Sequence, residues 1–149
     1  MKKSILAVSS GGGHWVELLR LCEAFAGHDL ALATVGAANR IDARNARFYT
    51  LRDVTRWNKV QWPAAIIGLL WVFLRERPDI VVSTGALPGY FALRLAKLFG
   101  ARTIWVDSLA NVDELSLSGR MAGKHADLWL TQWPHLAMSA GPYYRGSVL

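Results

Sequence analysis

With 149 residues the chain is about one domain long, so we expect residues 1–149 to form a single domain with a hydrophobic core. Its one cysteine, Cys22, excludes an internal disulfide and gives no indication of an oxidising compartment. The formal charge of +6, 52% hydrophobic residues and seven tryptophans fit an anionic membrane surface, and the lack of zinc-ligand spacing or an RNA-binding aromatic motif argues against a nucleic-acid partner.

Short aliphatic or β-branched runs alternate with helix-length segments along the chain. The first residues, MKKSILAVSS, are basic at the start, but their apolar run is too short for a secretory signal, and we interpret residues 4–10 as a strand. Further strands are expected at residues 29–36, 47–53, 79–85, 102–108 and 126–132, and helices at residues 14–27, 61–78 and 88–100. This alternation predicts an α/β fold with a doubly wound, mainly parallel sheet.

Three polar or glycine-rich loops follow strands of this sheet, at residues 9–14, 83–89 and 107–120. In doubly wound folds, ligands bind beyond the carboxyl ends of the strands. We therefore expect these loops to form one binding rim. The candidate substrate-binding residues on it are Ser10, Gly11, Gly12, Gly13, Thr84, Gly85, Gly89, Asp107, Ser108, Ser116 and Ser118.

The glycine turn after the first strand allows a ligand to approach the backbone closely, and the helix that follows offers free N–H groups for a phosphate. A tight turn without any ligand would use the same residues. The turn is not a P-loop, because His14 and Trp15 stand where Lys and then Ser or Thr are required. It is not a dinucleotide fingerprint either, because the second strand ends in TVGAAN without the acidic residue of that motif.

His14 stands where the first helix begins, and the helix dipole there favours the neutral imidazole. Such a ring can accept a proton from an attacking hydroxyl near neutral pH, so His14 is the candidate catalytic residue. The alternative is a polar cap of the turn. We expect Cys22, His28 and His125 to be structural or solvated, and we expect no metal ion or cofactor.

Residues 60–74 contain no charged side chain, and as a helix they span about 22 Å, short of the ~30 Å hydrocarbon core of a bilayer. Because this helix has no polar outer side, it is either wholly buried or covered by protein or lipid. Residues 40–59 before it carry six basic and two acidic residues. We predict membrane binding through Arg56, Trp57, Lys59, Trp62 and Trp71, whereas a buried helix with a solvated basic loop is the alternative.

Three segments resemble a known family: SGGGHWVELLRL, STGALPGYFALRLAKLFG, and VDSLANVDELSLSGR followed by ADLWLTQWPHLA. They are similar to the membrane-associated subunit of the two-component UDP-N-acetylglucosamine transferase of dolichol-linked oligosaccharide synthesis. Bacterial relatives of the PssD type act in capsule and exopolysaccharide synthesis. The resemblance covers nearly the whole chain, and SLSGR followed by ADLWLTQWP is its specific motif.

This resemblance implies a Rossmann-like, acceptor-binding amino-terminal half of a split GT-B glycosyltransferase related to MurG. The implied partners are a separate sugar-nucleotide-binding glycosyltransferase subunit, a polyprenyl-diphosphate-linked saccharide acceptor and a membrane surface. The resemblance places the glycine turn at the cleft where donor diphosphate and acceptor meet, and makes His14 a candidate base or diphosphate contact. It also implies peripheral attachment to the cytoplasmic face of the plasma membrane.

Two features differ from the family pattern. Eukaryotic members carry an amino-terminal transmembrane anchor, whereas this sequence starts at the first strand, so attachment is expected from residues 56–71. Those members also tend to have Glu where Asp107 stands. The resemblance leaves two alternatives open. The chain is either an enzyme subunit that supplies a base, or a non-catalytic membrane adaptor that recruits and activates the catalytic subunit. A third alternative, a stand-alone nucleotide-binding protein, would require sequence fingerprints that this chain lacks.

Overall fold

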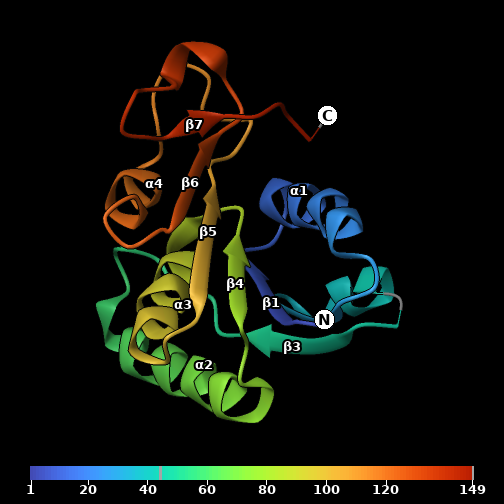
Figure 1. Ribbon diagram of the computed structural model, residues 1–149. Coiled ribbons are helices and arrows are strands. Elements are labelled where there is room, and N and C mark those ends of the chain that lie inside the picture. Colours follow the sequence, from blue (N-terminus) through green and yellow to red (C-terminus); the bar gives the residue numbers. More distant parts are fainter. Residues whose placement is uncertain (44, 149) are drawn as a thin grey trace.

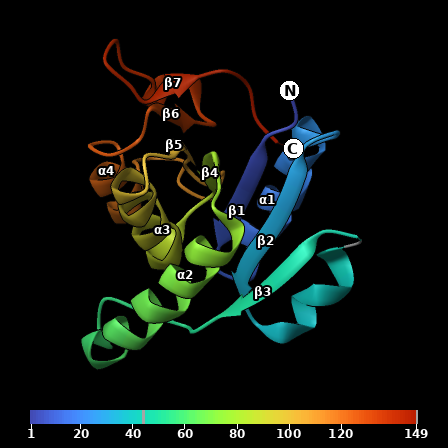
Figure 2. The same ribbon diagram turned by 60° about the horizontal axis from the view of Figure 1, so that its bottom comes forward.

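A computed structural model describes residues 1–43 and 45–148, which form a seven-stranded sheet with helices on both faces (Figures 1 and 2). The strands are β1 (Ser4–Ser9), β2 (Asp29–Val35), β3 (Arg47–Leu51), β4 (Ile80–Ser83), β5 (Arg102–Val106), β6 (Leu128–Thr131) and β7 (Tyr143–Tyr144). They are parallel and lie in the order β3-β2-β1-β4-β5-β6-β7. Because the order reverses between β1 and β4, this is the doubly wound α/β fold that the sequence predicts.

The helices are α1 (Gly13–Cys22), α2 (Trp62–Glu76), α3 (Ala86–Leu98) and α4 (Leu117–Ala122). Four 3-10 turns accompany them: η1 (Glu23–Phe25), η2 (Ala37–Ala43), η3 (Lys59–Gln61) and η4 (Pro134–Leu136). The first expected helix ends as an α-helix at Cys22 and continues as η1, and α3 begins two residues before its expected start. The sequence patterns missed α4 and β7 because six and two residues are too few to show a period.

The two faces of the sheet are covered by different elements. Leu6 and Val8 of β1 belong to the larger core cluster, which α2 and α3 complete. Ala7 points to the other face and packs with Trp15 and Leu18 of α1. Figures 1 and 2 show α1 and η2 on one face and α2, α3 and α4 on the other, so the elements that carry the glycine turn and the apolar helix cover opposite faces.

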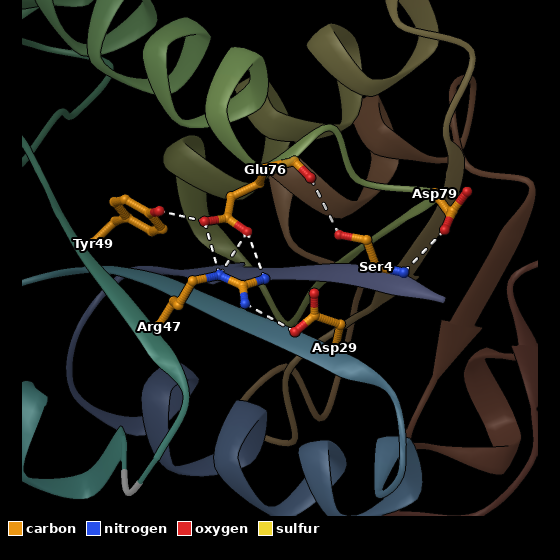
Figure 3. A network of polar contacts seen from close by, with 6 residues as sticks. All are labelled: Ser4, Asp29, Arg47, Tyr49, Glu76 and Asp79. Carbon is orange, nitrogen blue, oxygen red and sulfur yellow. Dashed lines mark hydrogen bonds and ion pairs between the residues drawn. The ribbon is translucent and has the colours of Figure 1, made fainter. Parts of the chain in front are cut away.

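An ion-pair network fastens the end of α2 to the sheet (Figure 3). Arg47 on β3 donates from Nε to both carboxylate oxygens of Glu76, at 3.0 and 2.9 Å, and from Nη1 to Asp29 on β2 at 2.8 Å. The hydroxyl of Tyr49 also donates to Glu76. The Glu76 side chain is only 4% exposed, and the hydrogen bond from Arg47 lowers the pKa of Asp29. The position of α2 on the sheet is therefore fixed by both charge and packing.

One side of α2 is buried and the other is open to solvent. The buried side consists of Ala65, Leu69, Val72 and Phe73. On the opposite side Ile67, Trp71 and Leu74 are 66%, 55% and 57% exposed. The alternative of a wholly buried helix is therefore wrong. Within residues 1–43 and 45–148, every helix is too short or too polar to cross a bilayer.

Candidate functional site

Two of the predicted rim loops meet because their strands are neighbours. β1 pairs with β4, with Val8 opposite Ser83, so the turns that follow these strands lie side by side. Nδ1 of His14 lies 3.1 Å from the carbonyl oxygen of Thr84. In return, the Thr84 hydroxyl donates to the carbonyl oxygen of His14 at 2.6 Å. This reciprocal pair joins the glycine turn to the β4–α3 turn.

The contact with Thr84 determines which nitrogen of His14 carries the proton. A carbonyl oxygen only accepts hydrogen bonds, so Nδ1 of His14 is the donor. In the neutral ring Nε2 then holds the free lone pair, which a base needs. The half-buried ring lies against Gly85, where an added Cβ would come within 2.6 Å of Cε1 and Nδ1. Gly85 also has φ 145°, a conformation that residues with side chains rarely adopt.

The glycine turn leaves the N-terminus of α1 open. Gly12 is the N-cap residue, with φ 67°, and no side chain of the described residues caps the helix. Gly12 and Gly13 are exposed, and an added Cβ on either would meet no atom within 4 Å, whereas Ser10 and Gly11 are half buried. The N-terminus of α3, capped by Gly85, also has no side-chain cap in the part of the chain that is described. The first turn of α1 therefore presents free N–H groups beside His14, an arrangement suited to an anion. The start of α3 offers fewer, because the Gly85 N–H donates to the Ser83 hydroxyl at 3.2 Å and Pro88 has no N–H.

Some predicted rim residues serve packing instead of facing this opening. Gly89 is buried, and a Cβ there would overlap the Ser83 hydroxyl oxygen, so Gly89 lets α3 approach β4 closely. Ser116 is the N-cap residue of α4, and its hydroxyl accepts a hydrogen bond from the Gly119 N–H at 2.8 Å. Ser118 is half buried on α4. Contacts of these residues with a substrate stay predictions.

The buried carboxylate of Asp107 is surrounded by internal donors. Its Oδ1 accepts from Trp105 Nε1 at 3.1 Å and from the Ser116 hydroxyl at 2.7 Å. Its Oδ2 accepts from Asn111 Nδ2 at 3.1 Å and from the Ser116 N–H at 3.0 Å. A Cβ at Gly119 would overlap Oδ1. Asp107 therefore shapes the loop that leads to α4.

Two polar residues of this region were not indicated by the sequence patterns. Glu17 on α1 is 7% exposed, and Gln132 after β6 is 3% exposed. Glu17 Oε1 accepts from the Ser108 hydroxyl at 2.8 Å and from the Leu109 N–H at 3.3 Å, and Oε2 accepts from Gln132 Nε2 at 3.0 Å. The available signal was an acidic residue inside the apolar stretch WVELL. Glu17 thus connects α1 to the loops after β5 and β6.

The predicted membrane-binding residues lie on α2 and on the loop before it. Trp57 is 81% exposed, and the Arg56 guanidinium lies 4.6 Å from the centre of its ring. The Arg75 guanidinium lies 5.6 Å from the centre of the Trp71 ring. These pairs place cations beside exposed indole rings, as at a headgroup interface.

Trp62 differs from these two tryptophans. Lys59 lies 5.9 Å from the centre of its ring, but the residue is half buried. The ring packs edge-on against Phe91 of α3 with a 5.2 Å centroid distance, and Nε1 donates to the carbonyl oxygen of Thr55 at 2.9 Å. The structure therefore gives Trp62 a packing role.

A groove of about 770 Å³ lies between α1, η1, β2 and η2, and neither His14 nor the glycine turn lines it. Its walls include Leu19, Leu30 and Cys22, and burial raises the pKa of the Cys22 thiol to about 12. Such a thiol is not a nucleophile at neutral pH. Among the described residues, no group of three or more His, Cys, Asp or Glu side chains is arranged to hold a metal ion.

The fold is that of one Rossmann-like half of a GT-B glycosyltransferase. The chain is similar to Acinetobacter baumannii MurG, with a TM-score of 0.76 and 14% identity over 97% of this chain and 45% of MurG. It is also similar to UDP-N-acetylglucosamine 2-epimerase from Rickettsia bellii, with a TM-score of 0.69 and 13% identity over 99% of this chain and 46% of the epimerase. The chain thus spans less than half the length of these solved structures.

The sequence comparisons identify the family. The family model described as "Oligosaccharide biosynthesis protein Alg14 like" matches residues 54–147. The UDP-N-acetylglucosamine transferase subunit ALG14 of Homo sapiens is 28% identical over 165 residues, which cover 89% of this chain and 76% of the relative. The ALG14 subunit of Eremothecium gossypii is 30% identical over 170 residues, which cover 91% of this chain and 75% of the relative. The chain belongs to the Alg14-like family, as the resemblance predicted, whereas the likeness to bacterial PssD-type proteins stays a prediction.

Proposed function

We propose that this chain is the acceptor- and membrane-binding subunit of a two-component glycosyltransferase in polysaccharide biosynthesis. The two-component enzyme transfers a sugar from a UDP-sugar to a polyprenyl-diphosphate-linked saccharide. A separate sugar-nucleotide-binding subunit supplies the other half of the GT-B enzyme. The observation that carries this proposal is the His14–Thr84 pair beside two uncapped helix N-termini. The names of the curated relatives, which are transferase subunits, agree with it.

The reaction is a displacement at the anomeric carbon of the donor sugar. Nε2 of His14 takes the proton of the acceptor hydroxyl as its oxygen forms a bond to that carbon. The bond from the carbon to the diphosphate oxygen breaks, and UDP leaves with the electron pair. The N–H groups at the start of α1 and α3 stabilise the negative charge that develops on the diphosphate. General-base catalysis of this kind contributes about 100- to 10,000-fold to the rate.

The outward side of α2 and the loop before it attach the chain to the membrane. Trp57, Ile67, Trp71 and Leu74 supply exposed apolar surface along this region. Arg56 and Arg75 lie beside the indole rings, and each cation near anionic lipid contributes about 1 kcal/mol. The attachment is peripheral and on the cytoplasmic face of the plasma membrane, where the rim meets a lipid-linked acceptor.

A non-catalytic adaptor that recruits and activates the catalytic subunit is the second candidate. The side chains of Asp107, Ser108 and Ser116 form hydrogen bonds within the chain. They are therefore engaged in holding the loops, and this favours an adaptor because few rim side chains other than His14 are free to react. In this alternative His14 only caps the glycine turn. The enzyme-subunit proposal differs from it in requiring His14 for turnover.

Co-purification from a membrane fraction identifies the partner and allows the proposal to be tested. Transfer from radiolabelled UDP-N-acetylglucosamine to a polyprenyl-diphosphate-linked saccharide is then measured with this chain, the partner and both together. We expect product only from the combination, because the proposal assigns the donor site to the partner subunit. Turnover by the purified single chain would contradict the proposal.

A further inference from the structure

Glu17 is a buried negative charge that the proposed reaction does not use. It lies on α1, three residues after His14, and is 7% exposed. None of the ion pairs formed by the described residues includes it. A buried carboxylate without a cation is unfavourable unless hydrogen bonds replace its lost hydration. The neutral donors around Glu17 therefore determine what it does.

Two of these donors belong to the loop after β5. The Ser108 hydroxyl donates to Glu17 Oε1 at 2.8 Å, and the Leu109 N–H points to the same oxygen at 3.3 Å. The carbonyl oxygen of Leu109 accepts from Trp133 Nε1 at 2.9 Å. The start of this loop is thus held on one side by α1 and on the other by the segment after β6.

The third donor is Gln132, which uses both ends of its amide. Nε2 donates to Glu17 Oε2 and to the carbonyl oxygen of Asp107, each at 3.0 Å. Oε1 accepts from the Val148 N–H at 2.9 Å, and the Val148 carbonyl oxygen accepts from Arg20 Nη1 of α1 at 2.9 Å. Glu17 and Gln132 therefore fasten three segments to α1: the loop after β5, the end of β6 and the residues near Val148.

We propose that Glu17 is a positioning residue for the transfer reaction, an inference that rests on the function proposed above. Its carboxylate holds the first turns of α1, and with them His14, in a fixed place against Ser108 and Leu109 at the start of the third rim loop. The site requires two accepting oxygens, because the Leu109 N–H faces Oε1 and the Gln132 amide N–H faces Oε2, and neither group can accept a hydrogen bond. Glutamine at this position would direct an N–H group at the N–H group of Gln132.

The test uses single substitutions and their combination. In Glu17→Gln two donors face each other, and in Gln132→Glu two carboxylates do, so each single variant loses the contact between α1 and the end of β6. In the double variant the amide introduced at position 17 donates to the carboxylate introduced at position 132, whose other oxygen still accepts from Val148, so the contact between α1 and the end of β6 is restored. The carbonyl oxygen of Asp107 loses its donor in Gln132→Glu and in the double variant alike, so the rescue is partial. Glu23→Gln, on the exposed residue that follows α1, removes the same charge without touching the network and serves as the control.

The first readout is hydrogen exchange of the Leu109 and Val148 amides in the chain itself. We expect exchange to be about tenfold faster or more in both single variants, because the like groups that face each other push α1 away from these segments and so weaken the hydrogen bonds of both amides. Exchange should be slower again in the double variant and close to wild type in Glu23→Gln. The second readout is turnover by the complex with its partner. We expect kcat to fall about tenfold in Glu17→Gln with an unchanged KM for UDP-N-acetylglucosamine, because the donor is held by the partner, and we expect partial recovery in the double variant.

Ser108→Ala, which removes the shorter of the two loop contacts with Glu17, gives the same comparison if Glu17→Gln does not fold. Unchanged hydrogen exchange in both Glu17→Gln and Gln132→Glu overturns the inference, whatever the transferase result. Normal kcat in Glu17→Gln, with kcat lost in His14→Asn, also overturns it and leaves the proposed function standing. Normal kcat in His14→Asn overturns the proposed catalytic role of His14 and, with it, the positioning role of Glu17.

Discussion

His14 and Thr84 form two reciprocal hydrogen bonds that join two loops of the rim. The imidazole Nδ1 donates to the carbonyl oxygen of Thr84 at 3.1 Å, and the Thr84 hydroxyl donates to the carbonyl oxygen of His14 at 2.6 Å. Each bond joins a side chain to the main chain of the other loop. The backbone of the β4–α3 turn therefore sets both the orientation of the ring and its neutral tautomer.

Gly85→Ala should displace the ring of His14. Its Cβ would come within 2.6 Å of two ring atoms, and φ 145° adds backbone strain. We expect the free energy of unfolding to fall by about 2 kcal/mol or more, measured by urea denaturation, with a loss of turnover in the complex. Gly100→Ala is the matched control, because Gly100 has φ 72° but no atom within 4 Å of an added Cβ. Similar losses in both variants would mean that His14 does not depend on Gly85.

Membrane attachment should depend on Trp57 and Trp71. Replacing both with Ser removes rings that are 81% and 55% exposed, so we expect binding to vesicles of anionic phospholipid to fall. The melting temperature should drop only slightly, through the lost edge-on contact between Trp71 and Tyr49. Trp62→Ser should instead lower the melting temperature, because that ring packs against Phe91. Unchanged vesicle binding in the double variant, measured by sedimentation, would remove α2 and its preceding loop as the membrane surface.

The Arg47–Glu76 pair should contribute substantially to stability. Arg47→Gln leaves the shielded Glu76 carboxylate without its cation, and we expect the free energy of unfolding to fall by about 2 kcal/mol. The loss is smaller than for a fully buried pair because the Arg47 side chain is 44% exposed. Lys3→Gln breaks the exposed contact with Asp79 and should change the stability by less than about 0.5 kcal/mol. Equal effects of the two substitutions in urea denaturation would refute the anchoring of α2 by Glu76.

Asp127 should contribute to stability only above acidic pH. Burial raises the pKa of its carboxyl, but hydrogen bonds from Lys97 and Thr103 outweigh that effect and leave the pKa below its ordinary value. The native state then binds this proton less tightly than the unfolded chain, whose pKa is about 3.9. The stabilisation is complete above about pH 4 and disappears as the pH falls through the native pKa. Asp127→Asn should therefore destabilise the chain at pH 7 more than at about pH 2.5, and equal losses at both values in urea denaturation would contradict the pKa direction.

The sequence predicts the sheet because its strands are continuous apolar runs between helices of clear period. It also predicts that the glycine turn and the β4–α3 turn lie at the same edge of the sheet, since both follow the carboxyl ends of parallel strands. The pairing of β1 with β4, which brings the two turns into contact, comes from the structure. It did not indicate the short elements α4 and β7, whose lengths show no period.

The site was less predictable because burial and hydrogen bonding cannot be derived from residue type. Asp107 and Ser108 follow a strand, as binding residues do, yet in the structure their side chains form hydrogen bonds within the chain. Glu17 and Gln132 contact each other across 115 positions of sequence, and no local spacing reveals such a pair. Trp62 and Trp57 look alike in the sequence, and the structure separates them by the burial of Trp62 and by its contacts with Phe91 and Thr55.

The kcat of the complex with His14→Asn and His14→Gln tests the central claim most directly. Asparagine keeps a donor where Nδ1 contacts Thr84 but has no atom in place of Nε2, whereas glutamine can contact a diphosphate but takes up no proton. With folding and partner binding close to wild type, we expect kcat to fall about 100-fold or more in both variants. Loss in His14→Asn alone would make His14 a diphosphate contact, and near-normal kcat in both variants would contradict the claim that this chain supplies the base.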